Sequence, residues 1–154
     1  MSVPSTLPAT ESEITAFLAA FEDGSLPKQC WTHGAHLLAG AWYVHQLGEA
    51  RALDHMRACV QRYNIAVGGQ NTATDGYHET VTVFWIMLLN AYLQLKQPID
   101  PTAFATSAVA YFALQRDIYR RYYDYDIVAS TEARFGWLPP TLQSITPESI
   151  SGEA

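Results

Sequence analysis

Two segments with the apolar periodicity of helices, residues 32–47 and 49–66, are separated in this sequence by Gly48 alone. A one-residue connection leaves the chain no room to travel, so the two helices must be antiparallel neighbours. Each segment repeats apolar residues every three or four positions, which is the spacing of one buried helix face. This helix pair constrains every later step of the predicted fold.

Signals at helix ends define a first helix over residues 11–23. Thr10 and Glu13 have the spacing of a capping box, and Gly24 supplies a stop. Thr32 is a suitable cap for the second helix, over 32–47.

Two more helices follow the polar loop 68–76. Residues 77–95 are the most apolar stretch and predict the central helix of the core. Asp100 as a cap and Pro101 at the first helical position open a fifth helix. This helix passes through Phe112 and runs or breaks on the way to Tyr123, and one more short turn is expected over 130–134.

No segment shows the strict alternation of a strand, so the predicted fold class is all-α. We expect a single-domain bundle of about five helices over residues 1–154, with its core at about 11–137. Residues 1–9 and 139–154 are expected as surface segments, the second a polar C-terminal tail.

The charge and hydropathy of the chain exclude several classes of partner. A net charge of −6, from 15 acidic and 9 basic residues, argues against nucleic acid and anionic membranes, since both require a basic face. No apolar run approaches the ~20 residues of a bilayer span, and no secretory signal is visible at the start. We therefore expect a cytoplasmic protein, with Cys30 and Cys59 as free thiols.

Histidines at two predicted helix starts make the main candidate site. If 32–47 and 49–66 are antiparallel and the helix over 77–95 reverses again, the first and third of these run parallel. His33, His36, His78 and Glu79 then meet at one end of the bundle, at nearly the same depth.

Three imidazoles and a carboxylate form a suitable set of ligands for zinc, iron, nickel or manganese. Glu79 is the expected fourth ligand or general base. Cys30 would extend the series to Cys-x-x-His-x-x-His and favour a structural zinc. The zinc-protease motif is absent, because Thr82 stands where its second histidine would be.

A small bundle with a few histidines at helix ends resembles the metal-dependent bundles of the DinB type. Those proteins use a His-x-x-x-His pair and one separate histidine, whereas the pair here is His33-x-x-His36. The resemblance is limited to the kind of site, histidine ligands at one end of a small bundle, and it implies no particular activity.

Aromatic and basic residues near the same end are expected to line a pocket. Arg116, Arg120 or Arg121 could bind a carboxylate there. Three further residues border this end. The expected pocket residues are Trp31, Tyr77, Thr82, Trp85, Tyr119, Tyr123 and Arg120, and the bordering ones are Cys30, Asn71 and Asp75.

The pattern supports three functions. The first is a small metalloenzyme that activates water for hydrolase or lyase chemistry, or that uses iron as an oxygenase. The second is a binding or sensor module, in which helix N-termini and histidines hold an anionic small molecule. The third is a structural protein with a packed histidine end. The expected partner is a small molecule, and a homodimer is possible.

Overall fold

The computed structural model describes residues 7–151, and this part of the chain is helical without strands. Residues 1–6 and 152–154 of the predicted surface segments lie outside the described residues. Seven α-helices occur in the described range, five of them with seven or more residues. The elements are α1 (Glu11–Asp23), η1 (Lys28–Cys30, a 3-10 turn), α2 (His33–Leu47), α3 (Glu49–Ala66), α4 (Glu79–Lys96), α5 (Pro101–Phe112), η2 (Ile118–Arg121, a 3-10 turn), α6 (Thr131–Phe135) and α7 (Pro147–Ile150).

The ends of α1 follow the predicted capping signals. The Glu13 backbone N–H donates to Thr10 Oγ1 at 3.2 Å, and the Thr10 backbone N–H donates to Glu13 Oε1 at 3.3 Å. Gly24 ends the helix with a φ of +81°, a left-handed conformation that glycine adopts without strain. The predicted range 11–23 is confirmed.

Helices α2 and α3 are joined through Gly48, as predicted, and α2 also contacts α4 and α5. The contact between α2 and α4 is close at Gly40. A Cβ atom at Gly40 would lie 2.8 Å from Leu89 Cδ1, so any other residue there would require the Leu89 side chain to move. Helix α2 is therefore held between three neighbours.

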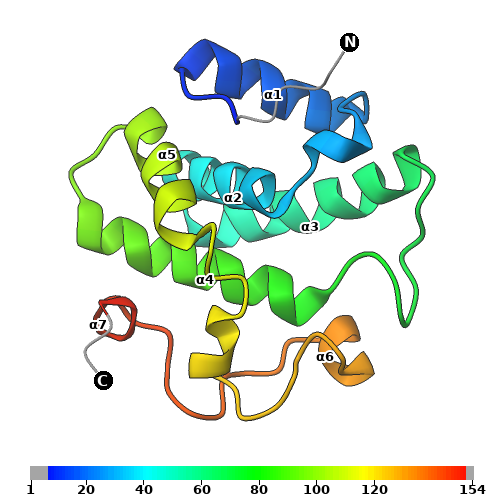
Figure 1. Cartoon of the computed structure of the whole chain (residues 1–154), viewed down its shortest axis with the longest axis vertical. Coiled ribbons are helices and arrows are strands. Elements are labelled where there is room, and N and C mark those ends of the chain that lie inside the picture. The colour runs from blue at the N-terminus through cyan, green and yellow to red at the C-terminus, as the bar shows by residue number, and fades with distance from the viewer. Residues whose placement is uncertain (1–6, 152–154) are drawn as a thin grey trace.

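Helix α4 lies between two parts of the chain. Figure 1 shows α2 and α3 on one side of it, and the C-terminal segment with η2, α6 and α7 on the other. Its apolar residues serve both contacts, since Ile86 and Leu89 reach the side of α2 while Phe84 packs on Tyr122 and Tyr123. A helix that is apolar on most of its faces is typical of such an internal position.

The fifth helix breaks at Phe112 and does not run to Tyr123. Tyr122 and Tyr123 are consecutive and both buried, at 0% and 2% exposure. Consecutive positions of a helix point about 100° apart, so one continuous helix would not bury both on the same neighbour. The turn η2 places both rings against Phe84.

The predicted polar tail is more than a surface segment. Residues 147–150 form the short helix α7, which packs on α4, and Ile150 is only 1% exposed. The Tyr122 hydroxyl and Ser149 Oγ lie 2.7 Å apart. Within the expected tail, Ile150 and Ser149 therefore attach α7 to the core.

The structure bears on the predictions for the two cysteines and for membrane-spanning helices. Cys30 and Cys59 are free thiols, and Cys59 is a buried core residue. Between residues 7 and 151, no helix is long and apolar enough to cross a membrane.

Candidate functional site

A cavity of about 610 Å³ lies at the end of the structure where α2 and α4 begin. Its walls come from Trp31 and Thr32 before α2, from α2 and α3, and from α4 with the residues just before it, and every lining residue except Arg116 belongs to the stretch 31–89. The lining residues are Trp31, Thr32, His33, His36, Leu37, Gly40, Met56, Val60, Asn64, Gly76, Tyr77, His78, Val81, Thr82, Trp85, Ile86, Leu89 and Arg116.

His33, His36 and His78 all reach this cavity, because α2 and α4 begin at the same end of the molecule. Four of the expected pocket residues line it as well, namely Trp31, Tyr77, Thr82 and Trp85. The predicted topology therefore places the starts of α2 and α4 at the same end correctly. The roles of the individual side chains differ from those predicted.

His78 is the N-cap of α4 and uses both of its ring nitrogens within the protein. The Val81 backbone N–H donates to Nδ1 at 3.1 Å, and Nε2 donates to the Ile127 carbonyl at 2.7 Å. The ring is therefore a neutral imidazole with no free lone pair. Burial lowers its pKa, which the Ile127 hydrogen bond opposes only in part.

His36 is held by its own helix and by an aromatic stack. Its Nδ1 donates to the Thr32 carbonyl at 2.8 Å, and its ring lies 4.1 Å from the Trp31 ring. The Trp31 ring stacks in turn on Phe21, also at 4.1 Å. Burial lowers the pKa of His36 to about 4, so the imidazole is neutral at pH 7.

His33 packs edge-on against Trp85, with ring centroids 5.3 Å apart. Burial and the nearby charge of Arg116 lower its pKa, and the Phe112 carbonyl raises it in part. His33 Nε2 and Trp31 Nε1 are the buried side-chain nitrogens for which the described chain supplies no hydrogen-bond partner. Trp31 and His33 both line the cavity, so the two unpartnered nitrogens belong to residues of its wall.

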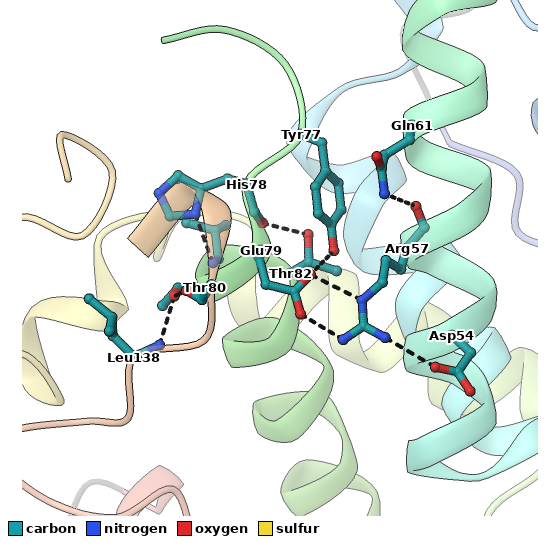
Figure 2. Close-up of polar contacts among 11 residues, drawn as sticks. Asp54, Arg57, Gln61, Tyr77, His78, Glu79, Thr80, Thr82 and Leu138 are labelled. Carbon is teal, nitrogen blue, oxygen red and sulfur yellow. Dashed lines mark hydrogen bonds and ion pairs between the residues drawn. The ribbon is translucent and has the colours of Figure 1, made fainter. Parts of the chain in front are cut away.

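Glu79 does not face the histidines. Arg57 of α3 donates to its two carboxylate oxygens at 2.6 Å and 3.0 Å, and the Tyr77 hydroxyl donates to Oε1 at 2.6 Å. Figure 2 shows the carboxylate extending toward α3, with the His78 ring on the other side of the chain. The hydrogen bonds from Arg57 hold the pKa of Glu79 below its usual range.

The structure does not support the predicted metal centre. Between residues 7 and 151, no three His, Cys, Asp or Glu side chains are placed so that they could hold a metal ion. His78 has no free nitrogen, and Glu79 is bound to Arg57 outside the cavity wall.

Three of the expected pocket residues lie elsewhere and hold the C-terminal segment. The Tyr119 hydroxyl donates to Asp126 at 3.1 Å, and the Arg120 guanidinium lies over the Tyr119 ring. The Tyr123 hydroxyl donates to the Leu138 carbonyl at 2.7 Å. The break after α5 carries these residues away from the cavity and leaves Arg116 at its wall.

The three bordering residues do not line the cavity either. Cys30 lies in η1 outside its wall, and Asp75 is an exposed loop residue. Asn71 has a structural role, because its Oδ1 accepts hydrogen bonds from Asn64 Nδ2 and from the Tyr77 backbone N–H. Asn71 thereby fixes the loop that delivers Tyr77 to the cavity.

The sequence interpretation missed the wall that α3 provides. Met56, Val60 and Asn64 line the cavity from this helix. Their spacing of four residues places them on one face, and Met56 and Val60 already mark the buried stripe of α3. The signal was therefore present, but periodicity alone does not separate a residue in the core from one at the wall of a cavity.

A second polar cluster, between α1, α2 and α3, is also unsuited to nucleophilic catalysis. His55 Nε2 lies 2.9 Å from Glu22 Oε2 and 3.5 Å from Cys59 Sγ, and the Tyr43 hydroxyl donates to the same carboxylate. Burial raises the pKa of the Cys59 thiol, so it stays protonated at neutral pH.

Charge is distributed unevenly around the cavity. Among its lining residues, as far as the chain is described, there is no Asp or Glu, and Arg116 alone has a full charge at neutral pH.

Comparison of the chain with protein-family models, with curated proteins and with solved structures finds no match.

Proposed function

We propose that this protein is a small-molecule-binding module, whose ligand occupies the cavity between α2, α3 and α4. The cavity volume of about 610 Å³ falls in the usual range for small-molecule sites, roughly 300–1,000 Å³. Its walls are mainly apolar and aromatic, with a few polar groups at one end, which is the usual composition of such a site.

The observation that carries the proposal is the pair of buried nitrogens without partners at the wall. A buried donor or acceptor without a hydrogen bond costs about 1–3 kcal/mol, and folded proteins contain few of them. Trp31 Nε1 and His33 Nε2 are both of this kind. A ligand with a polar end would give them partners that the protein itself does not supply.

Binding without catalysis is the form of this function that the side chains favour. Among the lining residues of the described chain there is no Ser, Cys or Lys, the usual nucleophiles of covalent catalysis. His78 is fully hydrogen-bonded. The Tyr77 hydroxyl donates to Glu79, whose carboxylate is paired with Arg57, so this pair serves as a structural contact.

A neutral fluorescent probe, N-phenyl-1-naphthylamine, tests the proposal. Its emission should rise saturably with the wild-type protein, with and without EDTA. Val81 lines the cavity, so Val81→Phe should weaken binding by at least about tenfold. The matched control is Val128→Phe, since Val128 is 48% exposed and outside the wall. Equal binding to both folded variants, or no saturable signal with the wild type, would overturn the proposal.

A further inference from the structure

The charged groups near the cavity select among the possible ligands. The chain as a whole is acidic, with a net charge of −6, yet the described cavity wall contains no Asp or Glu. The carboxylate of Glu79 is neutralised by Arg57 at 2.6 Å. A cationic ligand would therefore have no counter-charge, whereas an anionic one would meet Arg116.

Arg116 is available to such an anion. It is exposed, and neither a hydrogen bond nor an ion pair joins it to the part of the chain that the structure describes. Arg116, His33 and His36 line the same cavity, and the charge of Arg116 contributes to the lowered pKa of both histidines. A guanidinium presents two parallel N–H donors, which match the two oxygens of a carboxylate.

Other groups at this end of the cavity also favour negative charge. The N-terminus of α2, a helix of 15 residues, begins at His33 in the cavity wall. Thr32 Oγ1 caps the Ala35 N–H there, and the helix dipole places partial positive charge at this end. The indole N–H of Trp31 is a further donor, and it has no partner within the described chain.

The rest of the wall requires an apolar body. Trp85, Leu37, Ile86 and Leu89 face the space between α2 and α4, and Met56 and Val60 close it from α3. Burial of a ring against such side chains contributes about 25 cal/mol for each Å² removed from water. The polar end and the apolar body of the ligand are therefore recognised by different parts of the wall.

From this arrangement, which rests on the proposed binding function, we propose that the ligand is an aromatic monocarboxylate. Its carboxylate pairs with Arg116 beside His33 and the α2 N-terminus, and its ring lies against Trp85 and the aliphatic wall. The ligand class is thus set by one arginine and by the absence of acidic residues around the cavity.

Three naphthalene derivatives of similar size test this proposal by isothermal titration calorimetry. 2-Naphthoate should bind the wild-type protein at least about tenfold more tightly than neutral 2-naphthamide. It should also bind more tightly than 2-naphthalenesulfonate, whose tetrahedral anion matches the planar guanidinium less well. Arg116→Gln should abolish the preference for naphthoate over naphthamide. Arg120→Gln is the matched control, because Arg120 is exposed and lies outside the cavity wall, and it should keep the preference.

The outcomes separate the two proposals. Equal affinity for naphthoate and naphthamide, or an unchanged preference in Arg116→Gln, would overturn the carboxylate assignment and leave the binding function standing. Tighter binding of the sulfonate would assign the site to tetrahedral anions instead. If N-phenyl-1-naphthylamine binds but neither naphthoate nor naphthamide does, the ligand class is wrong. If none of the probes binds, the binding function itself fails.

Discussion

Arg57 on α3 and Glu79 at the start of α4 form a two-point ion pair, with N–O distances of 2.6 Å and 3.0 Å. The Glu79 side chain is 17% exposed, so the pair is partly removed from water. It joins two helices that both contribute to the cavity wall, and it fixes the Tyr77 hydroxyl through Glu79 Oε1. Glu79, expected to face the histidines, is thus paired with Arg57 and links α3 to α4.

This ion pair should contribute measurably to stability. Glu79→Gln is expected to lower the free energy of unfolding by about 1–2 kcal/mol, because Arg57 and Tyr77 lose a charged acceptor. Asp54 also pairs with Arg57, but its side chain is 78% exposed. Asp54→Asn is therefore the control and should leave the stability nearly unchanged. Urea unfolding followed by circular dichroism would measure both, and equal losses would contradict the structural role of Glu79.

His78 should act as a cap and a hydrogen-bond donor. His78→Ala removes the acceptor for the Val81 N–H and the donor to the Ile127 carbonyl, and should cost about 2 kcal/mol. His78→Asn keeps a capping side chain and should recover about half of the loss. Both effects should be the same with and without EDTA. A stability loss in the wild type on adding EDTA would point back to a metal.

His36 should make stability depend on pH. Its pKa is about 4 in the folded protein and about 6.5 in a model compound, so the unfolded state binds more protons between these values. Stability should therefore fall as the pH falls from 6.5 to 4, by about 3 kcal/mol from this group. His36→Asn keeps a donor for the Thr32 carbonyl without the titration. If the free energy of unfolding, measured with urea, depends on pH in the same way for the wild type and the variant, the lowered pKa of His36 is refuted.

Binding of 2-naphthoate should strengthen as the pH falls from 8 to 5. Burial is the main cause that lowers the pKa of His33 and His36, and the charge of Arg116 lowers both further. A carboxylate at Arg116 offsets this second contribution, so binding is accompanied by proton uptake. His78 and Tyr77 also line the site, but each already has a hydrogen-bond partner. Calorimetry at each pH should show this trend for naphthoate, a flat profile for naphthamide, and a smaller slope in His33→Gln. An opposite slope would indicate competition between protons and a cation.

Thr80 should be needed for the position of the C-terminal segment. It is fully buried, and its hydroxyl donates to the Gly136 carbonyl at 2.6 Å and accepts from the Leu138 N–H at 3.0 Å. Thr80→Val leaves both groups without partners and should cost about 2 kcal/mol. Thr82→Val removes a local hydrogen bond to the carbonyl of His78, the N-cap of the same helix, and does not touch the C-terminal segment, so it is the control. Similar unfolding midpoints for the two variants would show that this contact is dispensable.

The five long helices could be predicted from the sequence because local signals mark their ends. Thr10, Thr32 and Asp100 cap three of them through side chains of the usual capping types. The predicted start of the fourth helix at residue 77 precedes its observed start at Glu79, because His78 caps α4 with an imidazole, and the sequence alone presents that histidine as a candidate ligand. Local sequence shows that a histidine is present, but not which atoms its nitrogens will meet.

The course of the chain after Phe112 could not be predicted in the same way. Residues 113–123 contain neither proline nor glycine, so no local signal ends α5. The break arises from tertiary packing, because Tyr122 and Tyr123 both bury their rings on Phe84. This one break decides that Arg116 lies at the cavity while Arg120 and Tyr119 do not.

The cavity takes its shape and its charge from separate stretches of chain. Residues 31–89 supply every lining residue but one, and the remaining one, Arg116, comes from the connection after α5. A change at position 116 can therefore reverse the charge that the site accepts and leave the volume of the space as it is. Substitutions within α2, α3 and α4 can conversely reshape that space for a larger or smaller ring and keep the same ionic preference. The ligand charge and the ligand size that the cavity selects can thus change independently of each other.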